Sequence, residues 1–221
     1  MPSESSLEIK ERSYLIRQHR YSDTSLIVEW LTEEHGRVST MARGALRKKS
    51  ALAGKLDLFF FADISYRKNQ RSDLHLLKEV SLIATPGNIR KSYRRLNLLA
   101  YFVELIRRTT ESDTPVPEIF ALFHRTISEA AQVDSLNQLT LWFEWQLLDL
   151  LGLRPPVGES RLSGPAASIL NRWNTDTNYH EASDEFPTSE IATLLGYSWQ
   201  QELGSIPKLR GQVLSLGPGN P

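Results

Sequence analysis

The stretch that decides the fold runs from Leu56 to Tyr66 and reads LDLFFFADISY. Apolar side chains recur at every second position, and polar side chains largely occupy the positions between them. The apolar set is Leu56, Leu58, Phe60, Ala62, Ile64 and Tyr66. A two-residue period is typical of a β-strand that buries one face. We therefore predict a half-buried strand over residues 56–66.

Four similar runs flank this strand in the chain. Each is short, rich in β-branched or aromatic residues, and bounded by turn signals such as Ser-Asp or His-Gly. They are Tyr14–Gln18, Leu26–Thr32, Arg37–Ala42 and Leu74–Val80. Five short antiparallel strands with unequal loops predict a small closed barrel, of which the five-stranded oligonucleotide-binding (OB) barrel is a common form.

The period of the apolar residues changes after Pro86-Gly87. From there they recur every three or four positions, as in amphipathic helices. Three predicted helices lie around residues 96–106, 120–130 and 139–150, and Gly152 is the predicted C-terminal cap of the third. Shorter helices are predicted over Ala166–Trp173, Thr188–Leu195 and Leu209–Leu216. The predicted fold class is α+β: an OB barrel in residues 1–85, then an all-helical domain in residues 86–221.

Composition and motifs argue against an enzyme. The sequence has no cysteine, which excludes disulfides, thiolate catalysis and cysteine zinc sites. It lacks a phosphate-binding Gly-Lys-Ser/Thr loop, a Gly-x-Ser-x-Gly elbow and a His-Glu-x-x-His pair. We predict no catalytic residue, metal or cofactor, and interpret the histidines as surface or turn residues: His19, His35, His75, His124 and His180. With no long apolar run and no signal peptide, we expect a soluble cytoplasmic protein that does not bind membranes.

The residues from Gly36 to Lys55 place six cations among glycines and small residues, with no acidic residue between them. The cations are Arg37, Arg43, Arg47, Lys48, Lys49 and Lys55. Formal net charge is zero, yet residues 1–95 hold 18 Lys/Arg against 11 Asp/Glu and the remainder hold 8 against 15. A basic part of this kind favours a polyanion as its partner, and the alternative is a solvated loop that binds nothing.

A second basic turn joins the last two predicted strands. Single-stranded nucleic acid is bound by a cationic groove together with exposed aromatic faces. The turn adds Arg67, Lys68 and Arg71, and Tyr66 before it could stack on a base. Tyr14 and Tyr21 are further aromatic candidates, whereas Trp30 and Phe59 to Phe61 are interpreted as barrel core.

Several short segments, in this order, carry a resemblance to a known family. They are Arg20–Val28, Glu34–Ser39, Ala42–Ala45, Lys49–Leu56, Pro86-Gly87 and the helix from Leu96 to Leu105. Over roughly residues 10–152 the chain resembles the bacterial recombination mediator family RecO. The family's basic loop positions match Arg37, Arg43, Arg47, Lys48 and Lys49, so the resemblance implies that these residues contact phosphates.

The resemblance also implies a nucleoid-associated DNA repair protein. Such a protein binds single- and double-stranded DNA, anneals complementary strands, binds the acidic tail of the single-strand binding protein, and with RecR helps to load RecA. Candidate cations for the acidic tail are Arg107, Arg108 and Arg125. Many members carry a four-cysteine zinc module near the position of Leu153–Val157, where this chain has no cysteine. Two alternatives stay open: a protein-interaction adaptor with weak or no DNA binding, and an RNA-binding barrel.

Overall fold

The computed structural model describes residues 8–159, 162–181 and 186–215. The chain divides into two compact units. The barrel unit consists of Met1–Pro86 together with Thr110–Ala121, and the helical unit consists of Gly87–Thr109 together with Leu122–Pro221. Residues 110–121 therefore belong with the barrel, although they follow the first long helix in the chain.

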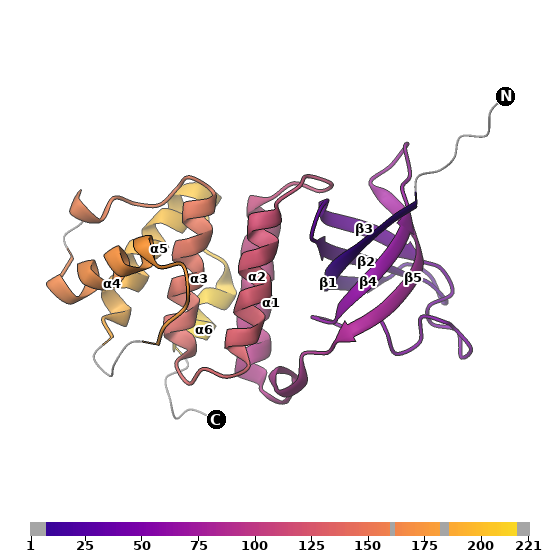
Figure 1. The fold of residues 1–221 in the computed structure, drawn as a ribbon, viewed down its shortest axis with the longest axis horizontal. Coiled ribbons are helices and arrows are strands. Elements are labelled where there is room, and N and C mark those ends of the chain that lie inside the picture. The colour runs from indigo at the N-terminus through magenta and orange to yellow at the C-terminus, as the bar shows by residue number, and fades with distance from the viewer. Residues whose placement is uncertain (1–7, 160–161, 182–185, 216–221) are drawn as a thin grey trace. The chain divides into compact units, whose positions relative to one another are not determined.

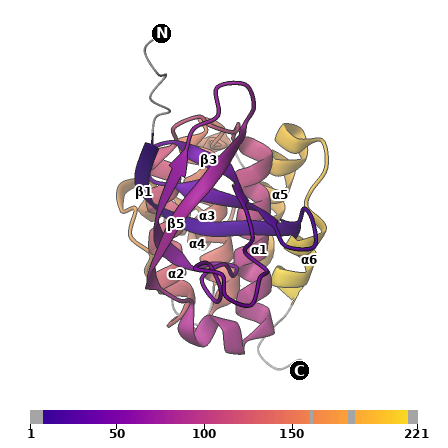
Figure 2. The same ribbon diagram turned by 90° about the vertical axis from the view of Figure 1, so that its right-hand side faces the viewer.

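Five strands form the closed barrel that the sequence predicted. They are β1 (Glu8–Arg20), β2 (Leu26–Thr32), β3 (Gly36–Ala42), β4 (Phe61–Arg67) and β5 (Leu74–Ala84). Their order around the barrel is β1-β2-β3-β5-β4. Four of these neighbouring pairs are antiparallel as predicted, but the β3–β5 pair is parallel, so the prediction of antiparallel strands was wrong for this pair. The long β1 pairs with β4 through its first half and with β2 through its second half, which closes the barrel (Figure 1). Figure 2 shows β1, β3 and β5 crossing the barrel wall obliquely.

The barrel interior is filled by alternate residues of the strands. Ala62, Ile64 and Tyr66 of β4 all point into this core, as their two-residue period predicted. The strand nevertheless begins at Phe61, so the prediction was wrong for residues 56–60. Phe59 has a φ of 63°, which is incompatible with an extended strand, and its N–H donates to the Leu15 carbonyl. Leu58 is left exposed by this turn.

The second part of the chain is helical, as predicted. Its elements are η1 (Gly87–Lys91), α1 (Tyr93–Thr109), α2 (Pro117–Ala130), α3 (Leu136–Leu150), η2 (Val157–Glu159), α4 (Gly164–Thr175), α5 (Thr188–Leu203) and α6 (Lys208–Ser215). Gly152 adopts a φ of 71° just beyond α3, which confirms the predicted glycine cap. Leu216, at the end of the last predicted helix, lies outside the described residues. None of the described helices is long and apolar enough to cross a membrane.

Helix α3 is the centre of the helical unit. It packs against α1, α4, α5 and α6, and all its residues from Gln138 to Leu148 are buried. One of them is a carboxylate, Glu144, which is 0% exposed and forms an ion pair with Arg210 of α6 at 2.9 Å. Tyr101 of α1 donates its hydroxyl to the same carboxylate at 2.7 Å. Burial, reinforced by the charge of Glu144, raises the pKa of Tyr101 well above its usual value and so keeps this donor protonated.

Candidate nucleic-acid interface

The barrel brings two basic segments together that are far apart in the chain. Leu76 of β5 pairs with Met41 of β3 on one side and with Arg67 of β4 on the other. Arg43 follows Met41 by two residues, so this pairing carries it toward the β4–β5 loop. The result is a groove of about 470 Å³ lined by Arg43 and by the loop residues Arg67 to Ser72.

The lining of this groove is cationic. Arg43, Arg67, Lys68 and Arg71 are all exposed side chains, and no acidic residue lies among the described residues that line the groove. The remaining lining residues are polar or apolar: Met41, Asn69, Gln70, Ser72, Leu74, His75 and Leu76. Four cations, with no carboxylate among the lining residues, create a positive potential that suits a chain of phosphates.

Hydrogen bonds within the β4–β5 loop hold the backbone that carries Lys68 and Arg71. Asn69 is central: its side-chain oxygen accepts from the N–H of Arg71 at 3.0 Å, and its side-chain nitrogen donates to the carbonyl of Leu74 at 3.3 Å. The hydroxyl of Ser72 accepts from the N–H of Leu74 at 3.0 Å. Asn and Ser form local turns of this kind readily because their short side chains reach the neighbouring backbone. The loop therefore has a defined conformation before any ligand binds.

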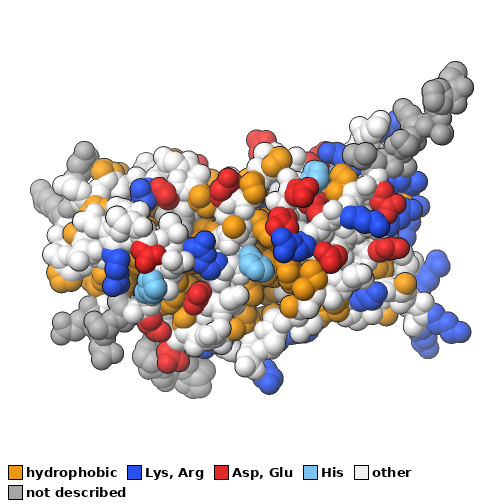
Figure 3. Space-filling model, viewed as in Figure 1, with side chains coloured by type: hydrophobic (Ala, Val, Ile, Leu, Met, Phe, Trp, Pro, Cys, Tyr) orange, Lys and Arg blue, Asp and Glu red, His pale blue; other side chains and the backbone are white. Residues whose placement is uncertain are grey.

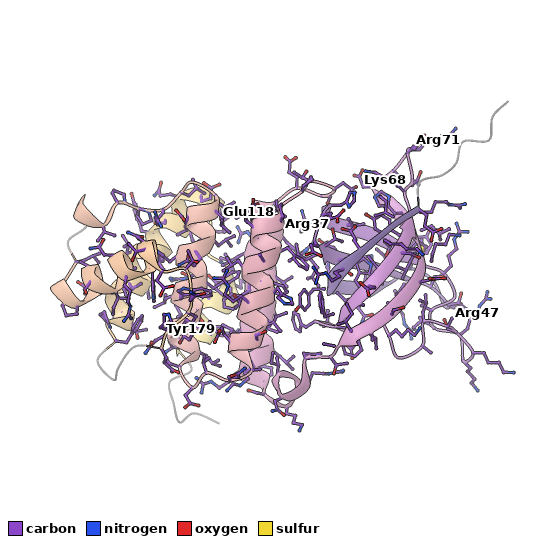
Figure 4. The ribbon with its side chains drawn as sticks, viewed as in Figure 1. Arg37, Arg47, Lys68, Arg71, Glu118 and Tyr179 are labelled. Atoms are coloured by element: carbon purple, nitrogen blue, oxygen red, sulfur yellow. The ribbon has the colours of Figure 1, made fainter. Side chains whose placement is uncertain are left out.

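The loop after β3 is also fixed to the barrel. The N–H of Leu46 donates to the carbonyl of Thr24 at 3.0 Å, in the β1–β2 turn, and Ala45 and Leu52 are buried in the barrel core. Between these anchors lie three consecutive exposed cations: Arg47, Lys48 and Lys49. Figure 4 shows Arg47 directed away from the barrel, well separated from Lys68 and Arg71.

The exposed cations thus form an extended surface, which we call the basic stripe. It consists of Arg43, Arg47, Lys48, Lys49, Arg67, Lys68 and Arg71. In Figure 3, blue Lys and Arg side chains lie at the right-hand end of the barrel unit, with red Asp and Glu side chains beside them. An extended stripe suits a linear polyanion better than a compact anion, because successive phosphates can be contacted along its length.

Arg37 lies elsewhere, contrary to its predicted contact with phosphate. It is buried, and its Nη1 donates to Glu29 Oε1 at 2.6 Å. The same guanidinium donates through Nε to the hydroxyl of Thr110 at 2.9 Å and through Nη2 to the carbonyl of Thr110 at 2.6 Å. Its charge and donors are already used inside the barrel unit, and we leave it out of the basic stripe.

Tyr66 and Lys55 also form hydrogen bonds within the barrel unit. Tyr66 is 1% exposed and its hydroxyl donates to Glu11 Oε1 at 2.8 Å, so its ring cannot receive a base. Burial, with the bond to Glu11, raises the pKa of Tyr66 far above its usual value. Lys55 is half-buried and its Nζ donates to the carbonyl of Val80 at 3.0 Å. Of the other aromatic candidates, Tyr14 is buried and Tyr21 is 62% exposed.

Two of the three cations suggested for an acidic peptide tail bond to different parts of the helical unit. Arg108 donates to the carbonyl of Leu203 at 3.1 Å, and Arg125 donates to the carbonyl of Thr177 at 2.5 Å. Arg107 is half-buried on α1. The contacts of Arg108 and Arg125 give these two cations structural roles and do not by themselves define a common binding site.

His75 is the residue of the groove that sequence reasoning missed. The interpretation as a surface or turn residue holds for the exposed His19, His124 and His180, but it is wrong for His75, which is 2% exposed. His75 shares the two-residue period of its strand with the buried Leu77. That periodicity was the available signal, because a strand position in phase with core residues points inward.

The segment Leu153–Val157 does not fit a zinc module. It reads Leu-Arg-Pro-Pro-Val and offers no side chain that binds zinc. Across the described ranges, no group of three or more His, Asp or Glu side chains is placed to hold a metal ion.

Replacing Arg37 by methionine is expected to lower the stability of the barrel unit without removing a cation from the basic stripe. The substitution leaves the largely buried carboxylate of Glu29 without its guanidinium, a loss of about 3 kcal/mol in the free energy of unfolding. Urea unfolding followed by far-ultraviolet circular dichroism measures this loss. A variant of unchanged stability whose DNA binding becomes less salt-dependent would instead place Arg37 on a phosphate.

Comparison with known proteins supports the family assignment along most of the chain. Residues 6–86 match the family described as Recombination protein O N terminal, and residues 90–168 match Recombination protein O C terminal. The chain is 36% identical over 149 residues to the DNA repair protein RecO of Pasteurella multocida, covering 66% of this chain and 60% of that protein. It is 28% identical over 167 residues to the protein of the same name from Prosthecochloris aestuarii, covering 73% of this chain and 63% of that protein.

A third relative, the DNA repair protein RecO of Actinobacillus pleuropneumoniae, is 31% identical over 149 residues, again 66% of this chain and 60% of the relative. The chain thus spans about 60% of the length of the curated relatives that it matches. The two matched regions together cover well over half of the sequence, and they coincide with the closed five-stranded barrel and the first helices after it. The chain therefore belongs to the RecO family.

Proposed function

We propose that this protein binds DNA through the basic stripe and acts in DNA repair by bringing complementary strands together. The observation that carries the proposal is the groove in which Arg43 meets Arg67, Lys68 and Arg71 on an OB barrel. Exposed cations that lie along one surface can hold a strand by its phosphates and leave its bases accessible.

The proposed mechanism is electrostatic. Each phosphate contact releases condensed counterions from the DNA, and this release favours binding. The contribution becomes smaller as the salt concentration rises, so the affinity falls. Phosphates are the same in every sequence and in both single and duplex strands, so the stripe would bind both forms with little sequence preference. Two strands held at neighbouring sites would meet at a raised local concentration, which accelerates annealing. No covalent step is part of this proposal.

The wider role follows from the family. The relatives carry the name DNA repair protein RecO, and we extend that role in homologous recombination to this chain. In the extended proposal the protein acts with RecR to help load RecA onto DNA that is coated by the single-strand binding protein. Arg107, Arg108 and Arg125 remain the proposed contacts for the acidic tail of that protein, and Arg108 would exchange its bond to Leu203 for the tail.

A strand-annealing assay tests the proposal. Two complementary oligonucleotides, one with a fluorophore and one with a quencher, are mixed with and without the protein, and a non-complementary pair serves as the control. The proposal predicts faster quenching of the complementary pair and a decline of this acceleration as salt is added. No acceleration, together with no DNA binding, would favour the adaptor.

Tyr21 is the aromatic residue best placed to stack on a base. It lies in the β1–β2 turn, which is hydrogen-bonded to the loop that carries Arg47 to Lys49. Replacing Tyr21 by alanine is expected to weaken single-strand binding by about 1–3 kcal/mol, the usual contribution of one stacked base. Duplex binding should stay unchanged, because the bases of a duplex are already stacked on one another.

Anisotropy titrations with a single-stranded oligonucleotide and with its duplex measure the two effects. The matched control is Tyr93 to alanine, since Tyr93 is 74% exposed at the start of α1 and lies outside the basic stripe. Equal losses of single-strand and duplex affinity for the Tyr21 variant would argue for a phosphate contact instead of stacking.

A further inference from the structure

The buried histidine at the base of the groove contacts both the basic loop and a distant segment of the barrel unit. His75 Nδ1 accepts a hydrogen bond from the backbone N–H of Asn69 in the β4–β5 loop, at 3.3 Å. On its other side, His75 Nε2 lies 3.0 Å from Oδ1 of Asp113. Asp113 belongs to the connector of residues 110–116 that joins α1 to α2 and packs with the barrel.

These contacts fix the proton on the ring. A backbone N–H can only donate, so Nδ1 must be the unprotonated nitrogen and the proton must reside on Nε2, where it is donated to Asp113. The ring plane is held as well, because His75 stacks on Tyr66 with centroids 5.5 Å apart and an interplanar angle of 6°. His75 thus has one orientation and one tautomer.

The position of Asp113 is set by its own backbone contact with β3 and does not depend on the β4–β5 loop. Its φ is 54°, in the left-handed region, and its N–H donates to the carbonyl of Arg37 at 2.8 Å. Arg37 in turn holds Thr110 through two hydrogen bonds. The connector is therefore attached to β3 independently of the groove, and its carboxylate is a fixed point to which the ring of His75 is bonded.

We propose that His75 and Asp113 are positioning residues for the β4–β5 loop, and that they set the affinity of the groove by holding Asn69. This inference rests on the proposed DNA binding. Asn69 bonds to Arg71 and Leu74, so fixing its N–H fixes the turn that presents Arg67, Lys68 and Arg71. A loop ordered before binding loses less conformational entropy when phosphates bind.

Two substitutions of His75 separate its bonds. His75→Gln can keep a donor near Nε2 for Asp113 but has no acceptor at the Nδ1 position, whereas His75→Asn can keep an acceptor near Nδ1 for Asn69. We expect His75→Gln to speed amide hydrogen exchange at Asn69 and to weaken single-strand binding about two- to tenfold, the effect of one lost hydrogen bond. His75→Asn should show smaller changes in both. The salt dependence of binding should stay that of the original protein, since no cation is removed.

Asp113 supplies an independent test of the same pair. Asp113→Asn keeps a side-chain oxygen and tolerates the positive φ at this position, so it should retain most of the effect of Asp113. Asp113→Gly also tolerates this φ but removes the carboxylate, so it should behave like His75→Gln. If the residues only stabilised the barrel, exchange would rise throughout the strands and thermal stability would fall, with no selective change at Asn69; that result would overturn the proposal.

The readouts separate this inference from the proposed function. Unchanged exchange at Asn69 and unchanged affinity in His75→Gln would overturn the positioning role while leaving DNA binding intact. If the original protein binds no DNA, the proposed function fails, and hydrogen exchange alone then decides whether His75 orders the loop.

Discussion

Replacing Arg67, Lys68 and Arg71 by alanine is expected to weaken single-strand binding by about tenfold or more at low salt. The three cations come from one loop, are exposed, and line the groove with Arg43. Each contact to a phosphate of a single strand contributes about 0.7 to the slope of log affinity against log salt, so the slope should become shallower by about 2. Anisotropy titrations at several salt concentrations measure both quantities.

A charge-matched control separates a local effect from the effect of net charge. Lys91, Arg172 and Lys208 are three exposed cations of the helical unit, and their replacement by alanine changes net charge by the same amount. The control variant should keep the affinity and the slope of the original protein. Equal losses in both variants would mean that DNA responds to overall charge and that the groove has no special role.

Replacing Arg210 by methionine is expected to lower the free energy of unfolding of the helical unit by about 3–5 kcal/mol, because one partner of a buried ion pair is removed. Arg210 donates to both oxygens of Glu144, at 2.9 and 3.0 Å, and to the carbonyl of Ala192 at 2.8 Å. The network joins α3, α5 and α6, and Tyr101 adds α1. Urea or thermal unfolding measures the loss.

The double variant Glu144→Gln with Arg210→Met tests the cause of that loss. It removes both charges and keeps an oxygen that can accept from the hydroxyl of Tyr101. The double variant should lose clearly less free energy of unfolding than the two single variants lose in sum, because no buried charge is left unpaired. Additive costs would show that packing around Arg210, and not its charge, provides the stability.

The architecture could be predicted because each period in the sequence reports one kind of element. The two-residue alternation in β4 and the three- and four-residue spacings after Pro86 reflect burial of one face, which the finished fold requires. The start of β4 could not be predicted in this way. Residues 56–60 continue the alternation in the sequence, but the left-handed backbone at Phe59 turns the chain out of the strand.

The candidate site was predictable only as a set of exposed cations. Arg37 and Arg43 belong to the same basic stretch, yet the connector of residues 110–116 covers Arg37 and leaves Arg43 exposed. That contact spans 73 positions in the chain, and no local pattern reports it. The meeting of Arg43 with the β4–β5 loop likewise depends on strand pairing through Leu76, which the order of the strands along the chain does not give.

The most direct test of the central claim is the fluorescence anisotropy of a labelled single-stranded oligonucleotide, titrated with the unmodified protein across a salt series. The account predicts binding whose log affinity falls linearly with log salt, with a slope of about −2 or steeper for three or more phosphate contacts. The same titration with a labelled acidic tail peptide of the single-strand binding protein provides the comparison. Binding of the peptide with no salt-dependent binding of the oligonucleotide would contradict the account.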